Sequence, residues 1–485
     1  MKNLLWVIPT FIVAATLIVE GNDGELIGYC LVGLLAIFAL VTVYRRNLAP
    51  SPNQHWAWEL LVLPTVLALG NAGVPRPIAI GALLFLVLAA LGRRSRPRDR
   101  TWYVAPILLV AAALWVSLRS SSFELPVATI GACATAWLVS RSVGSSRAII
   151  STLDGVGLYL VANVFAYFVL GARSVGADMR IGSLESTFGT ADRVVFPLVT
   201  NLNLAPVMAA VFLVAVPLLF DRSGWRRLVF RLVSFACAIV VLVASNGRAA
   251  LVIGVAVAVL VLLVPALVVR VAPVGAGLSV VFVMIFPVVA GIITTVFTLL
   301  TTVAPGLARD GGSEDPASLA NRDVIWGQSS SYWFVEVPTS SKVLGYGPLG
   351  QYLSGASSTY GSTLSGTSAY PEYASVHNSF LQQLFDGGIA GALLLSCGVI
   401  LTAIGATRLR PHLDLPHASA VGAVLVLAIT SITEVTLAPG YGEESYFVLV
   451  SLSFALAAGG NTTIMSAAAA PLTGDSKVLE PRHAE

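Results

Sequence analysis

Apolar runs long enough to cross a lipid bilayer recur along almost the whole chain. A helix needs about 20 apolar residues to span a hydrocarbon core about 30 Å thick. The 485 residues are 56% hydrophobic and 11% charged, with a mean hydropathy of +0.84, which excludes a water-soluble globule. We therefore predict an all-α polytopic membrane protein.

Charged residues and Pro/Gly clusters divide the chain into about fourteen apolar segments, which predicts about 12 to 14 transmembrane helices. The first segment lacks an A-x-A-like cleavage site, so we expect a retained helix and not a signal peptide. The predicted spans are 4–19, 26–44, 56–70, 77–92, 101–118, 124–140, 148–170, 196–220, 228–245, 249–269, 275–303, 385–406, 418–437 and 445–459.

Basic and acidic residues separate across these spans. Alternate connections carry YRRN, RRSRPRDR, RSVGSSR, DRSGWRR and RLRPH, and basic loops are retained on the cytoplasmic side. With both termini inside, that side holds 19 of the 28 Lys and Arg, and the acidic EGNDGE, DGGSEDP and YGEES lie outside. This topology already explains the basic runs, so nucleic acid is not expected as a partner.

Two connections on the predicted outer side, residues 171–195 and 304–384, are much longer than the others. Long loops of this kind usually carry function. They divide the chain into N-terminal helices (1–147), central helices (148–303), a large extracytoplasmic loop (304–384), C-terminal helices (385–459) and a cytoplasmic tail that we expect to be disordered (460–485).

The larger loop contains its own helical pattern. Between 315 and 337, apolar side chains recur near helical spacing, which predicts an amphipathic helix against the membrane face. These are Leu319, Ile325, Trp326, Tyr332 and Trp333. A GYGPLG turn follows, and then a Ser/Gly/Thr/Tyr-rich tract at 351–375 that is typical of a mobile or ligand-ordered segment.

His377 is the one histidine of five on the predicted outer side. A cluster of histidines around a metal is therefore excluded there. Most lone histidines are structural, but His377 opens a helical run that reaches a Gly387-Gly388 break before the next span. An imidazole titrates near neutral pH, so a general base is a plausible role at this position.

Arg248 lies where a helix is predicted to enter the bilayer from the same side, in the sequence ASNGRAAL. Ser245 or Asn246 is the expected N-cap, and Gly247 permits close backbone approach. A helix N-terminus next to a guanidinium favours an anion such as phosphate. The alternative is an arginine that extends toward lipid headgroups.

Taken in order, these motifs resemble the O-antigen ligase and O-antigen polymerase superfamily of bacterial membrane glycosyltransferases, over roughly residues 160–400. The resemblance is carried by Ser245 with Arg248, Arg322 with Trp326, the Gly345-Tyr346-Gly347 turn, and His377-Asn378 followed by Gly388 and Gly391. Asn203 in NLNLAPVMA is a weaker match to the pattern of this family. The family implies a fold similar to the GT-C glycosyltransferases, in the bacterial cytoplasmic membrane.

The resemblance implies transfer of a glycan from a polyprenyl-diphosphate carrier to the hydroxyl of a glycan or glycolipid acceptor, without a metal or cofactor. It implies that Arg248 and Arg322 hold the donor diphosphate and that His377 assists the acceptor, with Ser245 and Asn378 in support. The first long loop adds Arg180 and Arg193, and also Arg173, as candidates for contact with the diphosphate or glycan. Solvated loop positions are the alternative for these three.

Other functions remain open at this stage. A polymerase would use the same donor chemistry as a ligase. A metal-dependent transferase would place carboxylates from EGNDGE, SEDP or GEES around Mg²⁺ or Mn²⁺, although none has a tight Asp-x-Asp spacing. A lipid-linked glycan flippase or transporter would have a similar number of helices, but it would tend to show two related halves, which are not evident.

Several polar or reactive residues fall inside apolar spans. Asp154 and Glu59 are costly there, and we expect each to be paired or near a span end, without assigning a role. The four cysteines predict neither a disulfide nor a metal framework, because all fall in apolar spans: Cys30, Cys133, Cys237 and Cys397.

Overall fold

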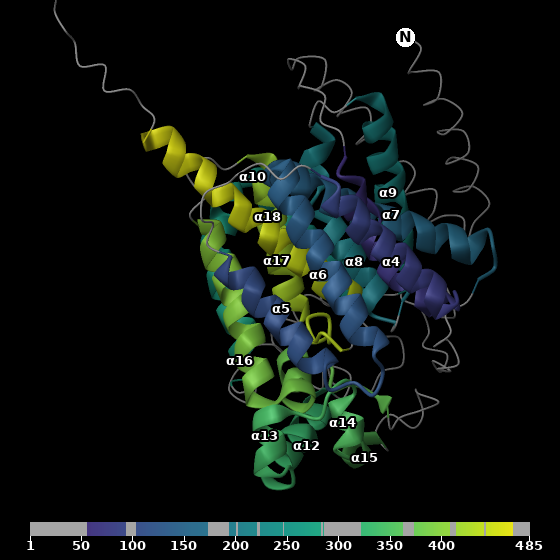
Figure 1. The fold of residues 1–485 in the computed structure, drawn as a ribbon, viewed down its shortest axis with the longest axis vertical. Helices are drawn as coiled ribbons and strands as arrows, with labels where there is room; N and C mark the ends of the chain where they lie inside the picture. Colours follow the sequence, from purple (N-terminus) through teal and green to yellow (C-terminus); the bar gives the residue numbers. More distant parts are fainter. Residues whose placement is uncertain are drawn as a thin grey trace, which may run out of the picture.

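The computed structural model describes residues 56–93, 103–172, 194–199, 202–220, 224–245, 247–282, 285, 322–361, 373–407, 414–440 and 443–468. These residues form helices joined by turns, with no strand among them (Figure 1). Together with their apolar composition, this confirms the all-α polytopic membrane class. The predicted spans 4–19 and 26–44 lie outside the described residues.

Four described helices are long and apolar enough to cross a membrane, by length and composition: Ser145–Phe168, Trp225–Ala244, Pro265–Phe282 and Ser379–Thr407. Shorter apolar helices occur at Trp58–Asn71, Pro77–Leu91, Val104–Ser117, Leu204–Leu213, Arg248–Leu263, Leu415–Thr430 and Glu444–Gly459.

The first half of the bundle is organised around helix α7. Its helices are α3 (Trp58–Leu67), η1 (Ala68–Ala72), α4 (Arg76–Leu91), α5 (Val104–Ser117), α6 (Glu124–Val143) and α7 (Ser145–Phe168). A Cβ at Gly155 of α7 would lie 2.6 Å from the Leu60 carbonyl oxygen, so glycine is required for α3 and α7 to approach this closely. Residues 148–157 of α7 are all buried, because α9 (Trp225–Ala244) and α18 (Glu443–Ala468) also pack against it.

Proline positions the breaks in the central helices. The segment predicted as one span at 196–220 is not one continuous helix: among its described residues, helix forms at α8 (Leu204–Leu213) and η2 (Val216–Phe220). Pro217 has no N–H to continue the α8 ladder, so the helix ends before it. After α9 (Trp225–Ala244), α10 (Arg248–Leu263) stops at Val264 and a new helix runs from Pro265 to Phe282, instead of the break predicted between 269 and 275.

Four short helices form a cap at one end of the bundle: α12 (Arg322–Val335), α13 (Thr339–Leu344), α14 (Gly350–Leu353) and α15 (Ser357–Tyr360) (Figure 1). The amphipathic helix predicted in this loop is α12. Ile325, Trp326 and Trp333 of its apolar face pack into a hydrophobic cluster that also contains Leu381 and Phe385 of the helix after the cap. Its position against the membrane face stays a prediction. Leu319 lies outside the described residues.

The last three helices connect the cap to the opposite end. They are α16 (Ser379–Thr407), α17 (Leu415–Thr430) and α18 (Glu443–Ala468). The predicted glycine break is present inside α16, where Gly388 has φ 64° and ψ −166°. Because α18 continues to Ala468, the beginning of the tail predicted to be disordered is helical.

Two ion pairs lie inside the bundle. Asp154 of α7 pairs with Arg231 of α9, and Glu59 of α3 pairs with Arg93 just after α4, so the expectation of pairing is confirmed for both carboxylates.

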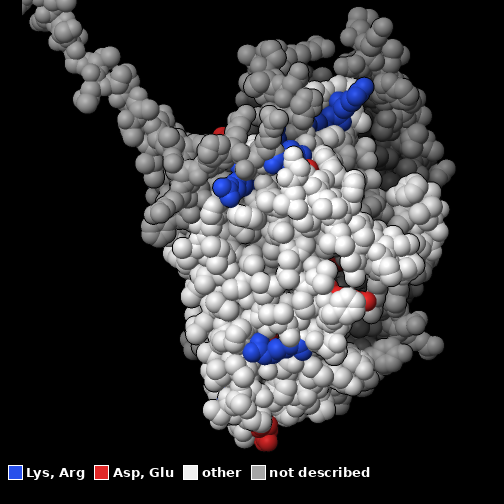
Figure 2. Space-filling model, in the orientation of Figure 1, with Lys and Arg blue, Asp and Glu red and all other residues white. Residues whose placement is uncertain are grey.

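Figure 2 shows Lys and Arg gathered mainly toward the end opposite to the cap, with a smaller group close to the cap. The wide surface between them is almost uncharged on this face.

Candidate active site

Polar side chains from three distant parts of the chain meet at Glu434, in the turn after α17. Arg322, the first residue of α12, donates from Nη2 to Oε1 of Glu434 at 2.6 Å and from Nε to the Thr433 carbonyl at 3.0 Å. Asn203, just before α8, donates to Oε2 at 2.8 Å. His377 Nδ1 lies 3.7 Å from the same Oε2. We call these four residues (Asn203, Arg322, His377 and Glu434) the Glu434 cluster.

The Glu434 carboxylate is largely buried, with 13% of its side chain exposed. Desolvation alone would raise its pKa, but the Arg322 guanidinium, with help from His377 and Asn203, outweighs this effect. The pKa of Glu434 therefore lies below its ordinary value. The cluster carries a fixed negative charge with a guanidinium and an imidazole facing it.

His377 is held by its neighbours along the chain. Trp326 donates its indole N–H to the Val376 carbonyl at 3.0 Å, and the Gln382 side chain accepts from the Val376 N–H at 3.3 Å. His377 itself has φ 50°, a left-handed conformation that costs a non-glycine residue of order 1–3 kcal/mol and tends to occur at functional sites. Its side chain is 26% exposed, so it is reachable from outside.

Asn378 and Ser379 connect this loop to the Glu434 turn. Asn378 is the N-cap of α16, because its side-chain oxygen accepts from the N–H groups of Phe380 and Leu381, and its amide donates to the Ile432 carbonyl at 2.9 Å. Ser379 donates its N–H to the Ser431 carbonyl and its hydroxyl to the Glu434 carbonyl. The base candidate and the carboxylate are thus fixed to one scaffold.

The Gly345-Tyr346-Gly347 motif is a structural device of the cap. Gly345 and Gly347 have φ 78° and 88°, and the N–H groups of Tyr346 and Gly347 donate to the carbonyls of Phe385 and Asp386. A Cβ at Gly388 would lie 2.4 Å from the Val343 carbonyl oxygen. The glycine turn and the α16 break therefore form one tight backbone contact.

Arg248 begins α10, as the sequence predicts, and its side chain is half-buried. The predicted N-cap is wrong for Ser245: Gly247 occupies that position, while Ser245 caps the end of α9 and donates its hydroxyl to the Val241 carbonyl. A Cβ at Gly247 would lie 2.3 Å from Pro206 Cβ, so α10 starts directly against α8. Asn203, just before α8, connects this region to Glu434.

Arg180 and Arg193 lie outside the described residues, as do Arg173 and Asn246. The described chain resumes at Val194, whose N–H donates to the Ala244 carbonyl at the end of α9 at 2.9 Å. The role expected for these arginines stays a prediction.

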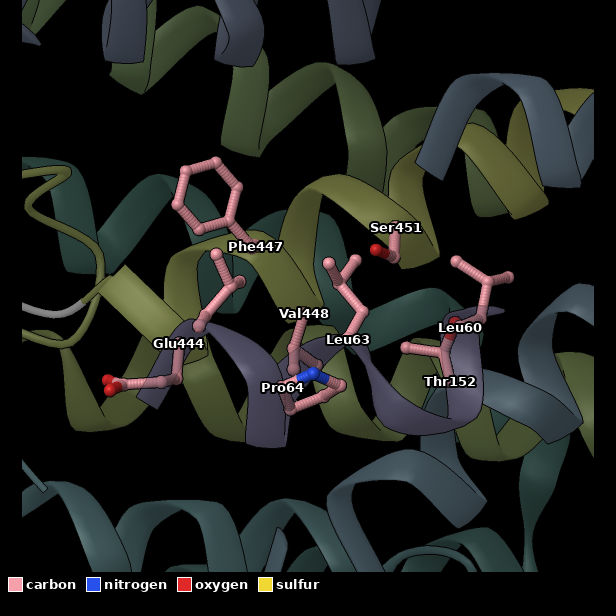
Figure 3. Close-up of a pocket in the computed structure, with 9 residues that line it drawn as sticks. Leu60, Leu63, Pro64, Thr152, Glu444, Phe447, Val448 and Ser451 are labelled. Atoms are coloured by element: carbon pink, nitrogen blue, oxygen red, sulfur yellow. The ribbon is translucent and has the colours of Figure 1, made fainter. Parts of the chain in front are cut away.

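A small void lies among α3, α7 and α18, and none of the predicted site residues lines it (Figure 3). Glu444 faces it and accepts from the Asn71 amide at 2.7 Å. The void shares no residue with the Glu434 cluster, and its other lining residues are Leu60, Leu63, Pro64, Leu67, Thr152, Phe447, Val448 and Ser451. Among the described residues, no group of three His, Cys, Asp or Glu could hold a metal ion.

Residues 233–396, from within α9 to within α16, match the family described as O-antigen ligase. We call this matched segment, about a third of the chain, the O-antigen ligase domain. This domain contains Ser245, Arg248, Arg322, His377 and Asn378, and it supports a ligase-like role in polysaccharide assembly in a membrane. No curated protein matches the chain.

Two members of the Glu434 cluster, Asn203 and Glu434, lie outside the O-antigen ligase domain. Asn203 lies in a segment that weakly matches the family pattern, whereas no motif marks Glu434. One signal was available: Glu434 is an acidic residue placed directly after the apolar residues of α17, where an unpaired charge would be costly.

Proposed function

We propose that the protein is an inverting, metal-independent glycosyltransferase of the ligase type. It would move a glycan from a polyprenyl-diphosphate carrier to an acceptor hydroxyl on the extracytoplasmic face of a bacterial cytoplasmic membrane, with both termini in the cytoplasm. The observation that supports this most is that Arg322 and His377 face one carboxylate, Glu434, at the cap end of the O-antigen ligase domain.

The reaction requires a base for the acceptor and positive charge for the leaving group. The acceptor oxygen bonds to the anomeric carbon as its proton passes to His377, a contribution of about 10²- to 10⁴-fold in rate for a general base. The bond between the anomeric carbon and the phosphate oxygen breaks, and its electron pair stays on the carrier diphosphate. Direct attack on the opposite face inverts the anomeric centre.

Arg322 and Arg248 would stabilise the charge that develops on the diphosphate, each by a few kcal/mol, about what one electrostatic donor supplies. Arg248 suits this role because it opens α10, where backbone N–H groups and the helix dipole also favour an anion. Arg180 and Arg193 would add to the diphosphate site from the first long loop. Asn378 supports His377 through the α16 cap, and Ser245 supports the turn before Arg248.

A deletion strain tests the proposal directly. It should lack one surface polysaccharide and accumulate the carrier-linked precursor, which can be extracted and offered to purified protein in nanodiscs with the candidate acceptor. We expect Arg322→Ala and His377→Ala to lower glycan transfer at least about 10²-fold. Lys342→Ala removes another cap cation, whose amine bonds to the Phe334 carbonyl away from the cluster, and should transfer normally. Wild-type rates in folded His377→Ala and Arg322→Ala would disprove the proposal.

The same assay separates the alternatives. A polymerase would lengthen the carrier-linked glycan with no other acceptor present. A flippase would move the extracted precursor across a vesicle membrane without forming a glycosidic bond. A metal-dependent transferase would lose activity in excess chelator, whereas we expect full activity there.

A further inference from the structure

The two carboxylate oxygens of Glu434 face different residues of the site. Its Oε1 accepts from Arg322 at 2.6 Å, and its Oε2 accepts from Asn203 at 2.8 Å and lies 3.7 Å from His377 Nδ1. We propose that Glu434 is a positioning residue that keeps a proton on His377 Nδ1, so that Nε2 is the atom that receives the acceptor proton. The inference rests on the proposed role of His377 as base.

The neutral His377 imidazole can carry its proton on either ring nitrogen. A neutral imidazole has one N–H donor and one acceptor nitrogen, and the partner of one nitrogen selects which is protonated. His377 Nδ1 has no hydrogen-bond partner among the described residues, and the nearest charged oxygen is on Glu434. A carboxylate on this side favours Nδ1–H and directs the lone pair of Nε2 away from Glu434.

The same carboxylate matters during the reaction. When the acceptor proton reaches Nε2, His377 becomes an imidazolium, and the negative charge of Glu434 stabilises it without itself taking up a proton. The 3.7 Å separation exceeds a hydrogen bond by less than about 1 Å. Contacts of this kind are often long before substrate binds and shorten in the reacting complex.

The backbone holds Glu434 in place for this task. Its N–H donates to the Thr430 carbonyl at 3.0 Å, and its carbonyl accepts from the Ser379 hydroxyl at 2.8 Å. Ser379 lies two residues after His377 and also accepts from the Leu437 N–H at 2.9 Å. The distance between His377 and Glu434 is thus set by a rigid connection between α16 and the turn after α17.

The test combines Glu434→Gln with His377→Ala in the full chain in nanodiscs. We expect Glu434→Gln to lower kcat about 10²-fold, within the range of a general base whose tautomer is no longer fixed, and Glu434→Asp to recover part of it. In the His377→Ala background, Glu434→Gln should change kcat less than about threefold, because the effects of substituting two residues that act together are not additive. An equal effect in both backgrounds, or no effect in wild type, would overturn the inference.

Glu59→Gln is the matched control, because Glu59 is also a buried, arginine-paired carboxylate but belongs to α3 and Arg93. It should leave kcat unchanged.

A second measurement does not require transfer activity. It therefore tests the role of Glu434 even if the proposed function is wrong. The modification of His377 by diethyl pyrocarbonate, followed by mass spectrometry across pH, reports when Nε2 becomes nucleophilic. Glu434→Gln should move the midpoint of modification to lower pH, and Glu59→Gln should not. An unchanged midpoint in Glu434→Gln would overturn the positioning role whether or not the protein transfers glycan.

Discussion

Asp154 and Arg231 form a two-point ion pair in the interior of the bundle, with Arg231 Nε 2.8 Å from Oδ1 and Nη2 3.1 Å from Oδ2. Trp56 donates a further hydrogen bond to Oδ2 at 2.7 Å. Both charged side chains are almost fully buried. The pair ties α7 to α9, and its integrity depends on both partners being present.

Removing one partner should therefore lower the free energy of unfolding far more than replacing both partners with apolar residues. We expect Asp154→Ala to lower the free energy of unfolding by about 3–5 kcal/mol, because it leaves the Arg231 charge uncompensated. The double variant Asp154→Leu, Arg231→Met should recover most of this loss. Thermal unfolding in detergent measures both, and equal instability of the single and double variants would contradict the explanation.

A glycine-to-alanine pair tests the contact between the cap and α16. At Gly345, φ is 78° and a Cβ would lie 2.3 Å from the Asp386 carbonyl oxygen, so Gly345→Ala should cost more than about 1 kcal/mol and also impair glycan transfer. At Gly327, within α12, nothing lies within 4 Å of a Cβ, so Gly327→Ala should be neutral or stabilise by up to about 1 kcal/mol. Proteolysis of the cap in the two variants provides the readout.

The sequence predicts the parts of the fold that depend on local pattern. Long apolar runs predict the helices α7, α9 and α16, and the paired glycines predict the break at Gly388. The same reasoning fails where a helix end depends on one proline, as at Pro217 and Pro265, because proline inside an apolar run does not by itself say whether the run continues.

The candidate site is predictable only in part, for a physical reason. Arg322 and His377 stand out because cations and imidazoles are scarce on the predicted outer side. Their meeting point, Glu434, belongs to a different segment and is brought to them by the packing of α17 and by the contacts of Ser379. No spacing along the chain expresses this relationship, so only the three-dimensional structure reveals it.

The hydroxyl of Ser379 should matter for both stability and transfer. It donates to the Glu434 carbonyl at 2.8 Å and accepts from the Leu437 N–H at 2.9 Å, and the side chain is fully buried. Ser379→Ala should cost about 1–3 kcal/mol, because it leaves buried backbone groups unsatisfied, and it should lower kcat by loosening Glu434. Ser358→Ala removes an exposed hydroxyl bonded to the Gly355 carbonyl and is the control. Equal behaviour of the two variants in unfolding and transfer assays would refute the role of Ser379.

The opposite end of the bundle carries a pH-sensitive helix cap. Asp414 is the N-cap of α17, where it accepts from the His417 N–H at 2.9 Å and also bonds the His417 ring and the Ser146 hydroxyl. Burial alone would raise the pKa of Asp414, but these hydrogen bonds and the His417 ring bring it below its ordinary value. Because the folded-state pKa is lowered, the stabilisation is present above the ordinary aspartate range and is lost as pH falls through the lowered value.

Asp414→Ala should therefore destabilise the protein by about 1 kcal/mol near neutral pH, the usual cost of an N-cap. The difference between wild type and variant should shrink steadily as the pH falls below about 4, where the unfolded-state carboxyl is already protonated. Thermal unfolding of both proteins in detergent from pH 7 to pH 3 measures this difference. A gap that stays constant over that range would mean that the ionised carboxylate contributes nothing to the cap.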